Sequence, residues 1–179
     1  KIEIFNTGEY YINQLLPYSS EIINNDNINI FEELVFKTDK LHLLYRMSID
    51  GNNKKLFQNK IKNHSNIIVI VKTNENKIFG GYTSCIIKYP SKSEYKKDNT
   101  SFLFSIDLNE KFNIIENKIA IYDDNNYGIN FGNGDLVLFD WNNKCYSEFG
   151  RENSYYENKG ITRDEFCGGI KTDKGNYFI

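Results

Sequence analysis

The sequence predicts a mainly β protein (α+β) with a few helices, in which two antiparallel sheets form a β-sandwich flanked by short helices. Aromatic residues make up 15% of the 179-residue chain, and such side chains favour the pleated surface of a sheet. Short apolar segments alternate with Asn-, Gly- and Lys-rich joins, as strands alternate with hairpin turns. No region alternates strands with helices in the way that a parallel sheet requires.

The amino-terminal part of the chain is weakly patterned over residues 1–27. Within it, residues 9–16 form a candidate short helix, which Pro17 would end because proline cannot continue a helix. Residues 27–36 carry apolar side chains on one stripe and predict a helix. These two segments account for the helices expected before the first clear strand.

The next segments predict one strand and one amphipathic helix. Residues 41–48 alternate loosely between apolar and polar side chains, which indicates a strand or a segment that leads into a helix, and we favour the strand. Residues 54–62 follow a polar turn and place Leu56, Phe57 and Ile61 on one face, with lysines on the other. We therefore expect this helix to lie on an apolar surface.

The remainder of the chain reads as short strands separated by turn residues. A final strand is expected to begin near Gly169 or Tyr177. The other predicted strands cover residues 67–72, 78–89, 102–107, 119–122, 136–139 and 145–149.

Composition restricts the classes of protein to which this chain can belong. Its formal net charge is −2 with interspersed charges, which argues against nucleic-acid binding because a phosphate-reading surface needs clustered Lys or Arg. No apolar run approaches the roughly 20 residues of a membrane span, and no signal-peptide pattern is visible. We expect one domain over residues 1–179, and the start at Lys1 instead of Met suggests a fragment of a longer chain.

The three cysteines, Cys85, Cys145 and Cys167, are widely spaced and form no Cys-x-x-Cys pair. A zinc site or a thioredoxin-type motif is therefore not predicted, and a reducing, cytoplasmic compartment is the simple interpretation. We expect Cys85 in the core, Cys145 in a more exposed position after a polar turn, and Cys167 beside a backbone bend at two glycines.

Other candidate chemical groups point to structural roles. His42 is expected on a strand surface and His64 at a helix end, and two isolated histidines do not make a metal site. Residues 128–135 lack the third glycine and the following helix of a phosphate-binding loop, so they predict a tight turn that leads into a strand. Residues 123–126 lack the glutamate of a calcium loop and predict a solvated turn. No catalytic, cofactor-binding or metal-binding residue is predicted.

Several blocks of the sequence are distinctive when they are taken in order. The most distinctive is Ile78-Phe79-Gly80-Gly81-Tyr82-Thr83-Ser84. The remaining blocks cover residues 43–51, 57, 68–73, 101–105 and 127–136. In this order the blocks resemble one known family, the TLDc domain, which occurs in oxidation-resistance proteins and in nuclear-receptor-coactivator-like relatives. The resemblance extends over about residues 20 to 170.

The resemblance implies a sandwich of two antiparallel sheets, with a few helices and with no established catalytic centre. It also implies protection against oxidative stress and binding to the vacuolar-type proton ATPase, whose catalytic and membrane sectors such proteins help to separate. The expected function is therefore that of a non-enzymatic interaction domain in the cytoplasm, held near vacuolar or endosomal membranes by a protein partner. Two alternatives remain, a thiol-based antioxidant enzyme using Cys145 or Cys167, and a scaffold domain of a larger signalling protein.

The positions that carry the resemblance are expected to shape the fold. Arg46 and Asp50 could pair with each other or cap the turn into the lysine-rich helix. Asp135 is expected to bond the amides of its own turn. The other positions are glycines. Gly80 and Gly81 would permit a bend or close sheet contact, and Gly51 lies in the turn before the lysine-rich helix. Gly128, Gly132 and Gly134 are expected to supply backbone angles that other residues adopt only with strain.

The chain departs from the family pattern at its carboxyl end. The family usually closes with a strand carrying an acidic residue and a valine, whereas this chain closes with Asn176-Tyr177-Phe178-Ile179. We therefore expect one sheet edge to lie uncovered, and an uncovered edge can pair with another chain.

Overall fold

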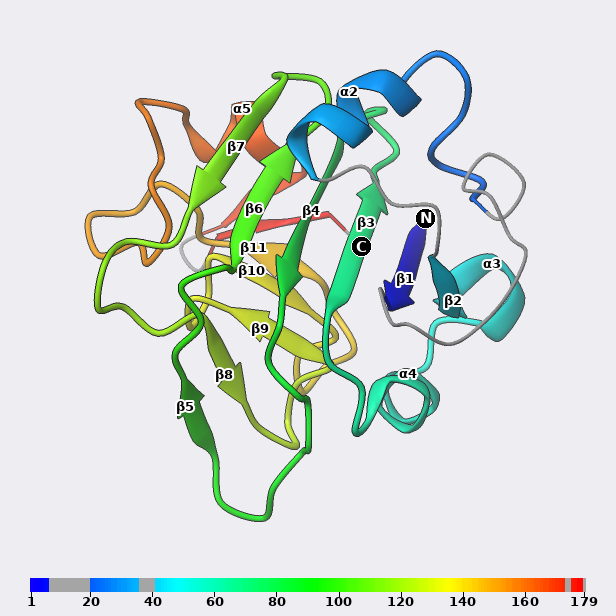
Figure 1. The fold of residues 1–179 in the computed structure, drawn as a ribbon, viewed down its shortest axis with the longest axis vertical. Coiled ribbons are helices and arrows are strands. Elements are labelled where there is room, and N and C mark those ends of the chain that lie inside the picture. Colours follow the sequence, from blue (N-terminus) through cyan, green and yellow to red (C-terminus); the bar gives the residue numbers. More distant parts are fainter. Residues whose placement is uncertain (7–19, 36–40, 173–174, 179) are drawn as a thin grey trace.

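A computed structural model describes residues 1–6, 20–35, 41–172 and 175–178 of the chain. Two antiparallel sheets face each other, as the sequence predicts, and short helices lie around them (Figure 1). None of the four helices in these residues has the length and apolar composition needed to span a bilayer.

The first sheet has six strands, in the spatial order β2-β1-β3-β4-β6-β7. The strands are β1 (Ile2–Asn6), β2 (His42–Arg46), β3 (Ile67–Lys72), β4 (Ile78–Thr83), β6 (Phe102–Ser105) and β7 (Glu110–Asn113). The central strand β3 is an unbroken apolar run because both of its faces are buried. Ile67, Val69 and Val71 face the second sheet, while Ile68 and Ile70 face the opposite side.

The second sheet has seven shorter strands, in the spatial order β12-β13-β11-β10-β9-β8-β5. They are β5 (Glu94–Lys96), β8 (Ile121–Asp123), β9 (Ile129–Phe131), β10 (Leu136–Leu138), β11 (Tyr146–Ser147), β12 (Ile170–Thr172) and β13 (Gly175–Tyr177). The main core lies between the sheets and includes Leu103 and Phe112 from the first sheet, and Phe131 and Leu138 from the second.

Helix α2 (Ile28–Leu34) gives the six-stranded sheet a second apolar layer on its outer face (Figure 1). The rings of Phe31 and Phe104 meet edge to face with their centroids 6.0 Å apart. Such a contact stabilises by about 0.5–1.5 kcal/mol beyond the area that it buries. The six-stranded sheet is thus the middle layer between α2 and the second sheet.

Three further helices fill the ends of the sandwich, namely α3 (Met47–Asp50), α4 (Lys54–Ile61) and α5 (Arg163–Cys167). Asn53 caps the start of α4, because its side chain accepts a 2.9 Å hydrogen bond from the backbone amide of Leu56. It buries Phe57 and Ile61, and the Phe57 ring lies 5.0 Å from that of Tyr45. Helix α5 begins with a capping box between Thr162 and Glu165.

Several predicted segments have different limits in the structure. The segment predicted as a strand over residues 41–48 divides into β2 and α3, and the strand predicted over residues 78–89 ends at Thr83. Residues 128–135 contain β9 before the tight turn. The helix predicted over residues 9–16 lies outside the described residues. The elements that were not predicted are β1, β5, β7, β9, α3, α5 and one of the two closing strands, β12 and β13.

Strand β4 ends early because Asp98 holds the chain that follows it. The hydroxyl of Thr83 and the backbone amide of Ser84 both donate to Asp98 Oδ2, at 2.9 and 2.6 Å. The chain then leaves the sheet and pairs with the end of α4, where the amide of Ile87 donates to the carbonyl of His64. Cys85 is consequently half-buried instead of lying in the core.

Candidate functional site

The paired glycines of β4 make room for aromatic side chains on both faces of the sheet. A Cβ atom at Gly81 would lie 2.8 Å from a methyl group of Leu103 and 3.0 Å from the ring of Phe131 in the second sheet. At Gly80 a Cβ would collide with the carbonyl oxygen of Val69 and lie 2.7 Å from the Phe104 ring. Neither glycine has a positive φ, so the close approach explains them and a bend does not.

Asp135 lies at the centre of a buried polar cluster after β9. Its carboxylate accepts a 2.5 Å hydrogen bond from the Ser154 hydroxyl and a 2.7 Å bond from the amide of Tyr155. Burial raises the pKa of Asp135 to about 6, against the lowering effect of these hydrogen bonds. The prediction that Asp135 bonds its own turn is wrong, because Asn130 accepts the amide of Gly134.

The three glycines near Asp135 have different reasons for their positions. Gly132 and Gly134 have φ of +59° and +126°, a region that other residues adopt only with strain. Gly128 has no positive φ, so the predicted backbone explanation is wrong there. A Cβ at Gly128 would instead lie 2.7 Å from the carbonyl oxygen of Leu138 and 2.9 Å from the Phe57 ring.

Arg46 and Asp50 lie close together, but their side chains have other partners. Asp50 accepts a 2.9 Å bond from the backbone amide of Arg46 and pairs with Lys60 at 2.7 Å. The Arg46 guanidinium pairs with buried Glu3 at 2.9 Å. Gly51 ends α3, and its carbonyl accepts the Tyr45 hydroxyl at 2.5 Å. The Asp50 carboxylate therefore binds the backbone at the start of α3, and the cap that was predicted for the turn into α4 is made by Asn53 instead.

The cysteines lack the exposure that thiol chemistry requires. Cys145 and Cys167 are fully buried, and burial raises the pKa of each to about 12. The expectation that Cys145 is exposed is wrong because β10 and β13 enclose it, and its sulfur accepts the amide of Phe139 at 3.4 Å. Cys85 is half-buried, and burial raises its pKa as well. A reactive cysteine needs the reverse, an accessible thiol with a lowered pKa.

The remaining polar candidates are engaged within the fold. Asp123 is buried and not part of a solvated turn, because it accepts the backbone amides of Lys88 and Tyr89 and pairs with the Lys96 ammonium. His42 is exposed on β2, as predicted, and His64 follows the end of α4. Within the described ranges, no group of three His, Cys, Asp or Glu side chains is placed to hold a metal ion.

A groove of about 460 Å³ opens where the turn at the end of β3 meets the edge hairpin of the second sheet. It lies between the turn that joins β3 to β4, the turn before Cys145, and the β12–β13 hairpin, and its lining includes Glu75, Lys144, Ile170 and Phe178. Ile170 is 75% exposed on the edge strand β12, and Trp141, on the same turn as Lys144, is 68% exposed. Large exposed apolar side chains beside a groove are typical of a protein-binding surface.

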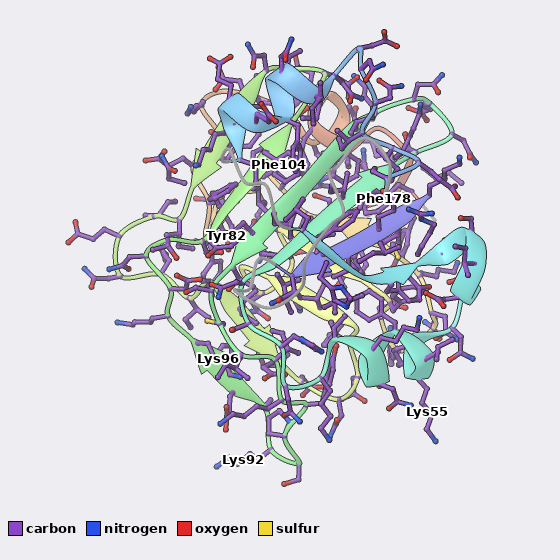
Figure 2. The ribbon with its side chains drawn as sticks, turned by 45° about the vertical axis from the view of Figure 1, so that its right-hand side comes forward. Lys55, Tyr82, Lys92, Lys96, Phe104 and Phe178 are labelled. Atoms are coloured by element: carbon purple, nitrogen blue, oxygen red, sulfur yellow. The ribbon has the colours of Figure 1, made fainter. Side chains whose placement is uncertain are left out.

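Charge is divided between opposite ends of the molecule. Lys55 and Lys92 project from the end formed by α4 and the chain leading into β5 (Figure 2), whereas Asp26, Glu32 and Glu33 lie in or next to α2 at the other end (Figure 1). Sequence reasoning missed this division because positive and negative residues alternate in most of the chain. The signal was a local count of charged residues. Residues 51–62 contain four lysines and no acidic residue, and residues 86–97 contain four lysines and one acidic residue.

Comparison with known proteins matches this chain to the family model described as TLDc domain, over residues 16–168. No curated protein matches the sequence. The matched range contains all of the predicted motif positions, from Arg46 to Asp135. It also covers most of both sheets and all four described helices. The chain belongs to the TLDc domain family.

Proposed function

We propose that this domain is a non-enzymatic interaction module of the oxidation-resistance type. In this proposal it acts in the cytoplasm, binds the vacuolar-type proton ATPase, and regulates the association of the catalytic sector with the membrane sector. Protection against oxidative stress would follow from that regulation. Membership of the TLDc family supports the class of protein, and the ATPase as partner comes from the resemblance described above.

The observation that carries the proposal is that the motif residues lie inside the fold and contact other parts of it. Gly81 admits the Phe131 ring, and Asp135 bonds the chain at Ser154 and Tyr155. A family signature made of such positions specifies an architecture instead of a reaction. Because these residues face inward, recognition of a partner is left to the surface.

A thiol enzyme is the less favoured function. With a pKa of about 12, only about one part in 10⁵ of the Cys145 or Cys167 side chains would be thiolate at neutral pH. The thiolate is the form that attacks a peroxide. Each thiol is also enclosed by core side chains.

The groove beside β12 is the surface that we assign to the protein partner. Ile170 lines the groove, and Trp141 is exposed on the turn that carries the lining residue Lys144. Exposed aromatic anchors often carry much of the binding energy in protein interfaces. Strand β12 is also the edge of its sheet, and all three of its residues are exposed. An extended segment of a partner could add to this edge.

The test uses vacuolar membranes that carry assembled ATPase. The membranes are incubated with the purified domain and ATP and are then sedimented, after which domain and catalytic-sector subunits are measured in the pellet and the supernatant. We expect the domain to bind and the catalytic sector to move into the supernatant. Absence of binding at high micromolar concentration would reject the ATPase as the partner.

A further inference from the structure

The end of the molecule formed by α4 and residues 86–97 carries an unbalanced positive charge. We call this surface the lysine-rich end and define it by four exposed lysines, Lys55, Lys62, Lys88 and Lys92. Lys55 and Lys62 belong to α4 and its carboxyl end, whereas Lys88 and Lys92 precede β5. Figure 2 shows Lys55 and Lys92 projecting from the same end of the molecule.

Backbone hydrogen bonds fix the two halves of this surface to each other. The amide of Asn63 donates to the carbonyl of Ile87 at 2.6 Å, and the amide of Ile87 donates to the carbonyl of His64 at 3.1 Å. These bonds place Lys62 beside Lys88. The buried ion pair between Lys96 and Asp123 holds β5 in the same assembly. The four lysines are therefore presented on a preformed surface.

The acidic groups near this surface are already engaged. Asp50 pairs with Lys60, Glu94 lies 3.7 Å from Lys96, and Asp123 also pairs with Lys96. Asp124 accepts the backbone amide of Asn126 at 2.7 Å. The four defining lysines form no ion pair with any residue in the described ranges. Their charge is thus available to an external anion.

The kind of side chain favours a lipid surface over a protein partner. Residues 51–97 contain no arginine, whereas protein interfaces are enriched in arginine and depleted of lysine. Lysine is a flexible, strongly hydrated point charge, which suits a diffuse layer of headgroups more than a bidentate carboxylate contact. The grooves described in this structure, such as the one at Ile170, are lined by other residues.

Three apolar side chains are exposed among these lysines. Ile86 is 48% exposed, Tyr95 is 57% exposed, and Leu56, beside Lys55 on α4, is 37% exposed. The Tyr95 ring packs on Tyr122 with a centroid separation of 4.8 Å, so it is held in place. A tyrosine with an apolar ring and a polar tip suits the headgroup region of a bilayer. Acidic residues at the α2 end would turn the molecule so that the lysines face a negative surface.

We propose that the lysine-rich end docks this domain on an anionic lipid bilayer. This contact is separate from the ATPase groove, so either can fail without the other. Each lysine near an anionic leaflet strengthens binding about fivefold, which predicts reversible binding that weakens as salt is raised. Two contacts of moderate strength, one with lipid and one with the ATPase, would together hold the domain at the membrane more firmly than either alone.

The test is sedimentation of the purified protein with vesicles. Vesicles of phosphatidylcholine alone are compared with vesicles of phosphatidylcholine mixed with phosphatidylserine, at low and at raised salt. The double variant Lys55→Glu/Lys92→Glu is compared with the control Lys118→Glu/Lys171→Glu, which makes the same change of net charge at exposed lysines elsewhere. Thermal melting of each variant confirms that it is folded.

We expect binding only to the anionic vesicles, with a loss of about tenfold or more for Lys55→Glu/Lys92→Glu and a much smaller loss for the control. Equal binding to neutral and anionic vesicles would overturn the proposal, as would equal losses in the two variants. A parallel measurement uses duplex DNA of mixed sequence at the same salt. Tighter binding to DNA than to the vesicles, lost in the same variant, would assign this surface to nucleic acid and would also overturn the proposal.

Discussion

Asp135 Oδ2 lies 2.7 Å from the backbone nitrogen of Tyr155, twenty residues further along the chain. This bond fastens the turn after β9 to the segment that returns to the first sheet, where Tyr156 pairs with Ile114. The hydroxyl oxygen of Tyr156 lies 2.6 Å from Ser101 Oγ. A motif aspartate thus links the two sheets through a loop that lies far from it in sequence.

Replacing Asp135 with Asn should remove the part of the pH dependence of the free energy of unfolding that comes from this carboxyl group. Burial raises the pKa of Asp135 from 3.8 to about 6 in the folded protein, so the folded state holds this proton more tightly than the unfolded chain. The stability from this group is therefore complete below about pH 4 and is lost as the pH rises towards about 6, by up to about 3 kcal/mol.

The measurement is urea unfolding of both proteins across this pH range. Asn places one hydrogen-bond acceptor and one donor at the site. Other titrating groups, such as Asp98, whose pKa is lowered by hydrogen bonds, are present in both proteins, so their effect cancels in the comparison. The free energy of unfolding of the wild type relative to Asp135→Asn should fall as pH rises from about 4 to about 6. Parallel curves would contradict the assignment.

Enlarging the glycines of β4 should destabilise the fold in a defined order. Gly80→Ala meets the backbone oxygen of Val69, which cannot move without disturbing the sheet, and should cost about 3 kcal/mol or more. Gly81→Val presses on the side chains of Leu103 and Phe131 and should cost about 1–3 kcal/mol.

Gly51→Ala is the control for these glycines, because nothing lies within 4 Å of its added Cβ and only the backbone cost at φ +79° remains. That cost should be about 1–3 kcal/mol, because φ +79° with ψ 170° is a conformation that glycine alone adopts readily. Chemical denaturation of the three variants gives the order. A melting temperature for Gly81→Val equal to that of the wild type would reject the close-contact explanation.

Removing the hydroxyl of Tyr156 should show how much the polar contacts between the sheets contribute to the free energy of unfolding. This fully buried hydroxyl contacts Ser101 Oγ at 2.6 Å and donates to the carbonyl of Ala120 at 3.0 Å. Tyr156→Phe removes both bonds, while Ser101 keeps its bond to the carbonyl of Tyr82 and the Ala120 carbonyl keeps the amide of Gly132. The free energy of unfolding should therefore fall by about 0.5–1.5 kcal/mol. Tyr95→Phe, at an exposed ring, should leave it unchanged, and similar effects at the two sites would be inconsistent with the structure.

The three thiols should differ in their reaction with an aromatic disulfide reagent. Cys85 is half-buried and should react in the native protein, whereas Cys145 and Cys167 should react only as the fold opens. The number of thiols released with time, in native buffer and in denaturant, provides the measurement. Rapid reaction of all three in native buffer would reopen the peroxide-reducing alternative.

The sequence predicted the architecture well where the pattern is local. β3 has its predicted limits because an unbroken apolar run lies between two polar turns. α4 was visible because its apolar face and its polar first turn are contiguous in sequence. By contrast, β1 pairs with β3 more than 60 residues away, and no local pattern reports such a partner. The capping box of α5, at Thr162 and Glu165, was a usable signal that the prediction did not use.

The candidate surfaces were less accessible to sequence reasoning. The groove depends on a turn before Cys145 that meets the β12–β13 hairpin, so Lys144 and Ile170 line one opening only after folding. Trp141 is exposed on the same turn as Lys144. The exposure of Cys145 was mispredicted for the same reason, since a polar turn precedes it but two strands cover it. Exposure follows from packing across the fold, which a local pattern does not contain.

The central claim is that this domain acts through its surface and not through its thiols. The most direct test measures release of the catalytic sector from ATPase-bearing membranes by three proteins. These are the wild type, a cysteine-free variant (Cys85→Ser/Cys145→Ala/Cys167→Ala) and a groove variant (Trp141→Ala/Ile170→Ala), each first shown to be folded. We predict equal release by the first two and at least about a tenfold higher concentration requirement for the groove variant. Release that is lost with the cysteines and kept in the groove variant would contradict the account.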